Sequence, residues 1–140
     1  MAVIEIMLVD DYKEWRLKLR SILESFPDCR IVGEACTALE AIRKAAHLRP
    51  DLILLDIGMP LVSGIEAAPI IRRASPESKI IFVTQEDDSE VRAAALATGA
   101  EAYLLKSSAL TELRSAINQA FNASPIEAPV CLPVVSAVSG

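Results

Sequence analysis

The chain has 140 residues, of which 52% are hydrophobic, so it is long enough for one domain with a sizeable buried core. Its net charge of −5, with no Lys or Arg between Ser115 and Gly140, argues against nucleic-acid binding by this segment, which would need a basic surface. The three cysteines form no CxxC pair, and there is neither a secretory signal nor an apolar run near the ~20 residues of a membrane span, so we expect a cytoplasmic protein without membrane contact.

The N-terminal part of the chain predicts two strands, each followed by a helix. Residues 2–9 form the first strand, and the helix after it ends at Pro27. This helix is recognised by its apolar residues at helical spacing, which are Trp15, Leu19, Ile22, Leu23 and Phe26. The second strand covers 31–35, and Thr37 caps a helix that continues to about His47.

The middle of the chain predicts a third strand over 51–55. A loop containing glycine and proline then leads into a helix that ends near Arg73. Pro69 lies inside this helix and removes its hydrogen bond to Ile65, so the sequence leaves the start and the straightness of the helix open.

The remaining elements complete a regular alternation. A fourth strand is predicted over 79–84, an alanine-rich helix stops at Gly99, a fifth strand covers 101–105, and a last helix runs over roughly 109–122. Short aliphatic strands alternating with helices predict an α/β fold, a doubly wound five-stranded parallel sheet with helices on both faces.

Four of the predicted strands lead into residues suited to metal or phosphate binding. The first runs into Asp10 and Asp11, the third into Asp56, the fourth ends at Thr84, and the fifth leads to Lys106. The carboxyl ends of parallel strands lie at one edge of a sheet, where ligands bind, so we expect these side chains to converge. Two carboxylates roughly 4 Å apart repel by ~4 kcal/mol at an effective dielectric of 20, so three of them need a cation.

The expected cluster suits a divalent metal and a phosphoryl group. Lys106 supplies one positive charge, and oxygen ligands without His or Cys favour Mg²⁺ over Zn²⁺. The metal, the lysine ammonium and the Thr84 hydroxyl together would cradle a phosphoryl group. Asp56, alone at a central strand end, is the best candidate for a nucleophile that forms an aspartyl phosphate.

Over about residues 3–122 the chain resembles the receiver, or phosphoacceptor, domain of bacterial two-component response regulators. Its sequence is most like that of receivers that precede output domains with a LuxR/NarL-type helix-turn-helix. The residues that carry the resemblance are Asp10-Asp11, Asp56 with Gly58-Met59-Pro60, Gly64, Thr84, Gly99-Ala100, Tyr103 and Lys106. The resemblance implies a receiver domain over 1–122 and a flavodoxin-like sheet of order 2-1-3-4-5 with five helices.

The resemblance also implies the roles of the acidic residues. Asp56 accepts a phosphoryl group from a sensor histidine kinase. Asp11 and Asp56 bind Mg²⁺ together with the backbone carbonyl of Gly58, and Asp10 assists through water. The domain is then a phosphoacceptor switch in phosphorelay signal transduction, and it catalyses only its own phosphorylation and dephosphorylation.

The same resemblance implies a switch on the other side of the site. Lys106 and the Thr84 hydroxyl contact the phosphoryl oxygens, and Tyr103 swings inward when Thr84 moves. The face made by the fourth helix, the fifth strand and the fifth helix then changes, and a homodimer is expected on activation.

Three residues depart from the receiver pattern, and one of them is Pro69 in the predicted third helix. Most receivers have proline after the lysine, whereas Ser107 follows Lys106 here, and we therefore expect a trans peptide bond between them. Gln85 replaces the small residue common after the switch threonine and narrows access to the phosphorylation site.

Some of the same residues also fit other roles. Asp11 with Glu14 also fits a helix cap. An aspartyl-nucleophile phosphatase of the haloacid dehalogenase type would need a second acid two residues after Asp56, where Gly58 stands, so we reject that class. A degenerate receiver that acts only as a dimerisation module stays open, because the sequence does not prove phosphorylation.

The last predicted segment is an apolar, proline-containing tail over 123–140. Glu127 is its one charge, and disordered tails are normally polar. We therefore predict that part of 126–135 packs in extended form on this domain or on a neighbouring subunit. The alternative is the start of an interdomain linker.

Overall fold

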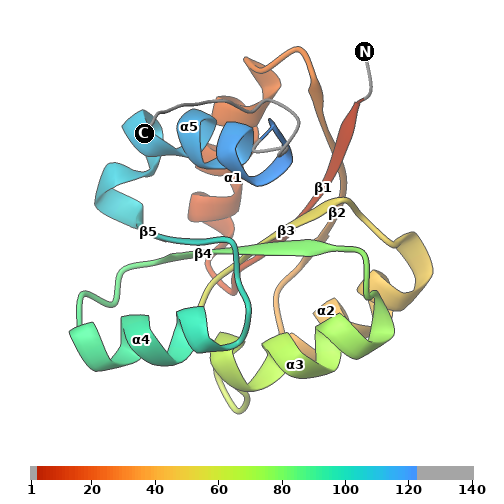
Figure 1. Cartoon of the computed structure of the whole chain (residues 1–140). Coiled ribbons are helices and arrows are strands. Elements are labelled where there is room, and N and C mark those ends of the chain that lie inside the picture. Colours follow the sequence, from red (N-terminus) through yellow and green to blue (C-terminus); the bar gives the residue numbers. More distant parts are fainter. Residues whose placement is uncertain (1–2, 123–140) are drawn as a thin grey trace, which may run out of the picture.

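Five parallel strands form one sheet in the computed structural model, which describes residues 3–122, and their order is β2-β1-β3-β4-β5 (Figure 1). The strands are β1 (Ile4–Val9), β2 (Cys29–Ala35), β3 (Leu52–Leu55), β4 (Lys79–Thr84) and β5 (Ala102–Leu105). The helices are α1 (Lys13–Glu24), α2 (Ala38–Leu48), α3 (Gly64–Ala74), α4 (Ser89–Ala97) and α5 (Ala109–Asn122). The predicted fold class and strand order are confirmed.

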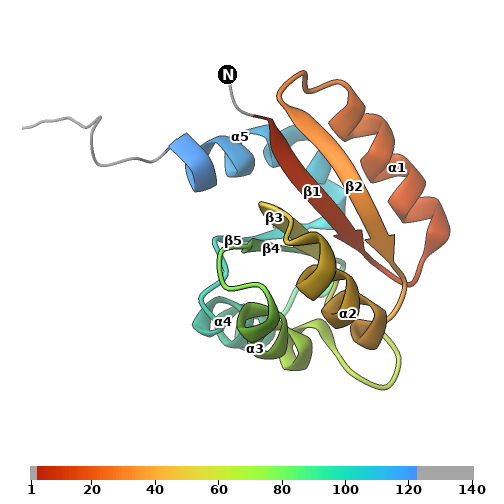
Figure 2. The same ribbon diagram turned by 90° about the vertical axis from the view of Figure 1, so that its right-hand side faces the viewer.

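Helices cover both faces of the sheet. α1 and α5 pack on one face, and α2, α3 and α4 pack on the other (Figure 1 and Figure 2). Successive side chains of a strand point to opposite faces, so each strand feeds both cores. In β1, for example, Leu8 packs in the α1/α5 core and Met7 in the other. β3 is buried along its whole length, and its carboxyl end therefore places Asp56 at the middle of the sheet edge.

Two predicted boundaries are corrected. β2 begins at Cys29 and not at residue 31, because its first residues pair with β1 from Ile4 onward. α1 ends at Glu24, three residues before Pro27, and the chain closes the helix with a turn in which the Phe26 N–H donates to the Leu23 carbonyl at 2.9 Å.

Polar side chains cap the first turns of α2 and α3. The Thr37 hydroxyl accepts a hydrogen bond from the Glu40 N–H at 3.1 Å, as expected. At α3, the Ser63 hydroxyl accepts from the Glu66 N–H at 3.2 Å, and the Glu66 carboxylate accepts from the Ser63 N–H at 3.0 Å. This capping box fixes the start of α3, and the helix continues through Pro69.

The backbone of the described residues tests one further expectation. The peptide bonds of the described residues include no cis bond, so the Lys106–Ser107 bond is trans as predicted. No helix within residues 3–122 is long and apolar enough to cross a membrane. The predictions for 123–140 fall outside the described part of the chain.

Candidate functional site

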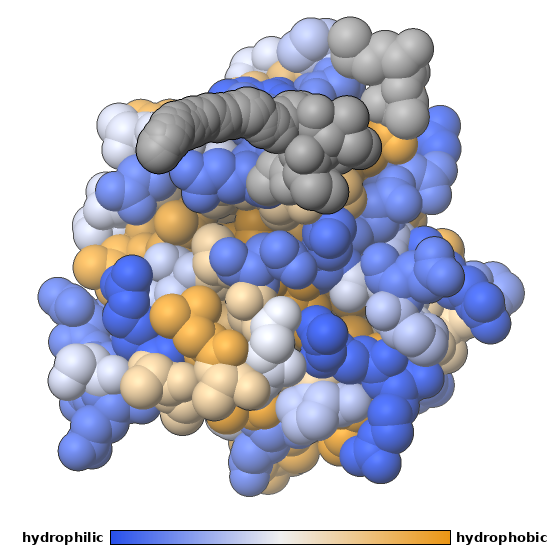
Figure 3. Space-filling model, viewed as in Figure 1, coloured by the Kyte–Doolittle hydropathy of each residue, from blue (hydrophilic) through white to orange (hydrophobic). Residues whose placement is uncertain are grey.

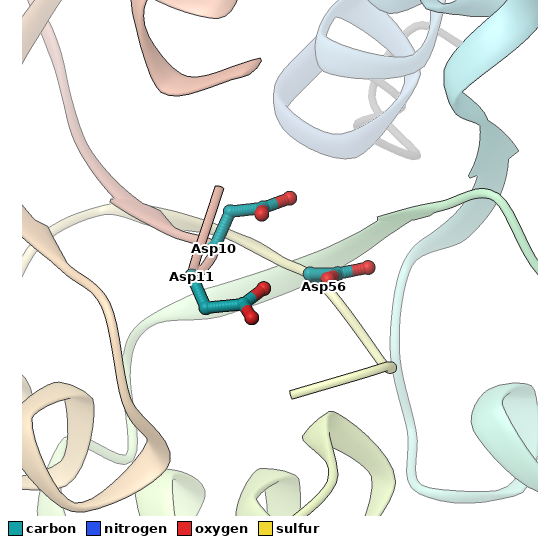
Figure 4. A group of neighbouring side chains, drawn as sticks. All are labelled: Asp10, Asp11 and Asp56. Carbon is teal, nitrogen blue, oxygen red and sulfur yellow. The ribbon is translucent and has the colours of Figure 1, made fainter. Parts of the chain in front are cut away.

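Three aspartates meet at the carboxyl edge of the sheet. Asp10 follows β1 and Asp56 follows β3, which is the neighbour of β1, and the Asp56 N–H donates to the Val9 carbonyl at 2.9 Å. One carboxylate oxygen each of Asp10, Asp11 and Asp56 lies within 4.8 Å of the others, and the three side chains point in the same direction (Figure 4). Asp10 and Asp56 are buried, whereas Asp11 is exposed.

Lys106 is a cation that faces the carboxylates of this cluster. Its Nζ atom lies 2.8 Å from Asp10 Oδ2 and 4.0 Å from Asp56 Oδ2. Burial raises the pKa of Asp56, the Asp10 carboxylate raises it further, and the Lys106 ammonium partly offsets both effects. One ammonium therefore faces three carboxylates, and the site remains short of positive charge.

A hollow of about 500 Å³ opens above the carboxylates. Its lining residues come from four strand ends and the loops after them, namely Asp11, Tyr12, Asp56, Gly58, Thr84, Gln85, Glu86 and Lys106. Gln85, which the sequence singled out as a departure, thus borders the same space as Asp56. Asp10 lies beneath this space, since its side chain is only 3% exposed.

The two glycines near Asp56 occupy different surroundings. A Cβ atom on Gly64 would lie 2.0 Å from the Asp56 carbonyl oxygen, so the start of α3 packs directly on the backbone of the central aspartate. The Gly64 N–H donates to the Ile57 carbonyl at 2.9 Å. A Cβ atom on Gly58 would meet nothing within 4 Å, because this residue faces the open hollow.

Thr84 and Tyr103 lie on neighbouring strands, and the side chain of each forms a hydrogen bond with the backbone of Glu86. Thr84 is fully buried, and its hydroxyl oxygen accepts a hydrogen bond from the Glu86 N–H at 3.3 Å. The Tyr103 hydroxyl donates to the Glu86 carbonyl, and the ring is only 7% exposed. Tyr103 therefore occupies an inward position, and burial followed by the Glu86 carboxylate raises its pKa. The Arg92 guanidinium lies 5.4 Å from the centre of the Tyr103 ring.

Two residues of α1 touch the site although sequence reasoning gave them no role there. Arg16 donates to the Asp10 carbonyl at 2.6 Å and to the Glu34 carboxylate at 2.9 Å. The Trp15 ring lies beside Lys106, with 5.4 Å between Nζ and the ring centre. Helical spacing predicts Trp15 in the core, and its position four residues after Asp11, about one helical turn, indicates that it lies near the site.

Comparisons with known proteins bear on this site. Residues 6–118 match the response regulator receiver domain model. The chain is 37% identical to the transcriptional regulatory protein LiaR of Bacillus subtilis over 96% of this chain and 64% of LiaR. It is 33% identical to the nitrate/nitrite response regulator protein NarL of Escherichia coli over 94% of this chain and 61% of NarL. It therefore spans less than two thirds of these curated relatives.

A solved structure gives the same assignment. The crystal structure of a two-component response regulator of the LuxR family from Aurantimonas sp. SI85-9A1 superimposes with a TM-score of 0.82 and 32% identity. The match covers 94% of this chain and 91% of that chain.

Proposed function

Since the chain belongs to the family of response regulator receiver domains and is related to its LuxR/NarL-type members, we propose that it is a phosphorylation-controlled switch with Asp56 as the phosphoryl acceptor. The observation that carries this proposal is the cluster of three carboxylates within 4.8 Å of one another, with Lys106 Nζ at 2.8 Å from Asp10. Of the three, Asp56 combines burial with a place on the wall of the hollow, where a phosphoryl donor can reach it.

The residues present fit a magnesium ion. The Asp10 Oδ2 atom is buried, has no hydrogen-bond partner within residues 3–122 and faces the Lys106 ammonium at 2.8 Å. Asp10, Asp11, Asp56 and the Gly58 carbonyl would hold Mg²⁺, which prefers such oxygen donors. When bound, the ion offsets the repulsion among the carboxylates and neutralises charge on the incoming phosphoryl group.

Phosphoryl transfer would proceed from the phosphohistidine of a sensor histidine kinase. A carboxylate oxygen of Asp56 forms the new P–O bond while the P–N bond of the donor breaks, and the imidazole leaves and takes a proton from water. The Lys106 ammonium then has phosphoryl oxygens as partners in addition to Asp10. The Thr84 hydroxyl oxygen accepts a bond from the Glu86 N–H, and its proton, which favours the ionised Asp56 carboxylate, would be donated to the phosphoryl group.

The signal would leave the site through α4, β5 and α5. The phosphoryl group draws the Thr84 hydroxyl toward it, and Tyr103 and the loop at Glu86 are linked to Thr84 by hydrogen bonds. α4 holds few anchors in the core, since Ala95 is its one fully buried residue. Its outer surface exposes pale apolar residues among hydrophilic ones (Figure 3). We expect this surface to form the homodimer on activation.

Acetyl phosphate tests the proposal without a kinase. With Mg²⁺, intact-mass spectrometry should show one added phosphate, and light scattering should show a larger dimer fraction. Both changes should be absent from Asp56→Asn and after chelation of the metal. A dimer that forms equally without phosphate, together with an unlabelled protein, would instead indicate a dimerisation module.

A further inference from the structure

Trp15 lies beside Lys106, the lysine that faces the carboxylates of the site. It stands in the first turn of α1 and packs on the core between the sheet and the α1/α5 layer. The Lys106 Nζ atom is 5.4 Å from its ring centre, within the range at which a cation is attracted to the face of an aromatic ring. The Lys106 side chain is only 16% exposed, so water screens this attraction weakly.

The buried indole of Trp15 costs free energy of folding, and packing alone does not explain why this side chain is used here. Its Nε1 atom is buried, and within residues 3–122 it has no hydrogen-bond partner. Leucine would fill an apolar position of this kind without leaving a buried donor unpaired. The feature that leucine lacks is the electron-rich ring face, and this face lies beside Lys106.

We propose that Trp15 is a positioning residue for Lys106, and this proposal rests on the phosphoryl-acceptor function of Asp56. An ammonium has three donors and no acceptor, and a ring face attracts its charge while leaving N–H donors free for phosphoryl oxygens. A carboxylate in the place of Trp15 would compete for those donors. The ring therefore holds the Lys106 ammonium near the site while this ammonium moves from Asp10, at 2.8 Å, toward the phosphoryl group on Asp56.

The rate of phosphorylation by acetyl phosphate at saturating Mg²⁺ tests this role in the full chain. Trp15→Leu should react roughly two- to tenfold more slowly than the wild type, the range expected for the loss of a partly buried cation–π contact. Trp15→Phe keeps a ring face and should recover part of the rate. A wild type without label at Asp56 would overturn the proposed function, whereas a labelled wild type with equally fast Trp15→Leu would overturn the role of Trp15 alone.

Two further variants separate positioning from packing. In a Lys106→Met background, Trp15→Leu should cause no additional loss of rate, because the ring then has no ammonium to hold. Leu19→Ala removes a buried side chain from the same face of α1, so it should lower the melting temperature and leave the rate unchanged. A rate loss that adds to that of Lys106→Met, or that Leu19→Ala reproduces, would show that Trp15 acts only through the stability of α1.

A third variant identifies the cation that the ring serves. Lys18 lies 5.9 Å from the same ring centre but belongs to the exposed side of α1. Lys18→Met should leave the rate unchanged. A loss equal to that of Trp15→Leu would assign the ring to Lys18 and overturn the proposal.

Discussion

Gly58, which follows β3, and Gly64, which begins α3, differ in the room that each has for a side chain. Gly64 has no room for a Cβ atom, which would lie 2.0 Å from the Asp56 carbonyl, whereas Gly58 has open space. We expect Gly64→Ala to lower the free energy of unfolding by about 1–3 kcal/mol and to displace Asp56. Gly58→Ala, its matched control, should change stability by less than about 0.5 kcal/mol. Urea unfolding measures both, and equal effects would contradict the tight packing of Gly64 on Asp56.

Asp56 should destabilise the metal-free fold. Burial and the Asp10 carboxylate raise its pKa, so ionisation of Asp56 weakens the folded state, and this penalty shrinks as pH falls from the raised pKa toward the ordinary value of 3.8. We expect Asp56→Asn to raise the free energy of unfolding at pH 7 by about 1–2 kcal/mol, because Lys106 already offsets part of the repulsion. Saturating Mg²⁺ should remove most of this gain. A variant less stable than the wild type without metal would contradict the electrostatic account.

Single residues show what the sequence can and cannot predict. Asp10, Asp56 and Lys106 follow strands, and strand ends of a parallel sheet converge whatever the loops do, so their meeting was predictable. The contact of Trp15 with Lys106 depends on how α1 is rotated and on the path after β5, and neither follows from hydrophobic spacing. Arg16 was missed for the same reason, since its partners are a backbone carbonyl and a residue of β2.

At the scale of elements, α3 carries a proline that it tolerates. Pro69 lacks the N–H that would donate to Ile65, and the helix continues past it. Pro69→Ala restores this donor at an exposed position and should raise the free energy of unfolding by about 1–3 kcal/mol. Pro76→Ala, in the exposed turn after α3, should be neutral or slightly destabilising. If Pro69→Ala were no more stable than the wild type, the missing hydrogen bond would have no measurable cost.

Element boundaries were predicted where a local signal exists. Thr37 caps α2 as its residue type indicates, and β4 covers the predicted 79–84. α2 ends at Leu48, one residue after the predicted end, and Arg49 after it adopts the left-handed conformation, with φ 47°, that glycine usually takes. The early start of β2 at Cys29 was missed because it depends on pairing with Ile4 and not on a local pattern.

At the scale of the whole molecule, an ion pair joins the last helix to the turn between α1 and β2. Arg114 donates to both carboxylate oxygens of Asp28, at 2.7 and 2.9 Å, and lowers the pKa of Asp28 from 3.8 to about 2. A lowered carboxyl pKa contributes stability that is fully present above 3.8 and is lost as pH falls through about 2.

Acid titration of stability tests this ion pair. Between pH 5 and pH 2 the wild type should lose about 0.5–1 kcal/mol more than Asp28→Asn, a value reduced for solvent screening of a partly exposed pair. The measurement is the difference between the two proteins in urea midpoint at each pH, which cancels the other carboxylates. Parallel curves would show that the pair does not contribute.

The global arrangement was the most predictable feature of this chain. Alternating strands and helices leave few topologies once crossovers are right-handed, and the resemblance to receivers selected one of them. The inward position of Tyr103 was not predictable, because it depends on a hydrogen bond to the backbone of Glu86 in a neighbouring loop.

The central claim is that Asp56 accepts the phosphoryl group, and the position of the modification tests it most directly. After reaction with acetyl phosphate and Mg²⁺, borohydride reduction converts an aspartyl phosphate into homoserine, which tandem mass spectrometry of peptides locates. We predict homoserine at residue 56 alone, and none in Asp56→Asn or after chelation of the metal. Homoserine at Asp10, at Asp11 or elsewhere in the chain, or equal labelling of Asp56→Asn, would contradict the assignment.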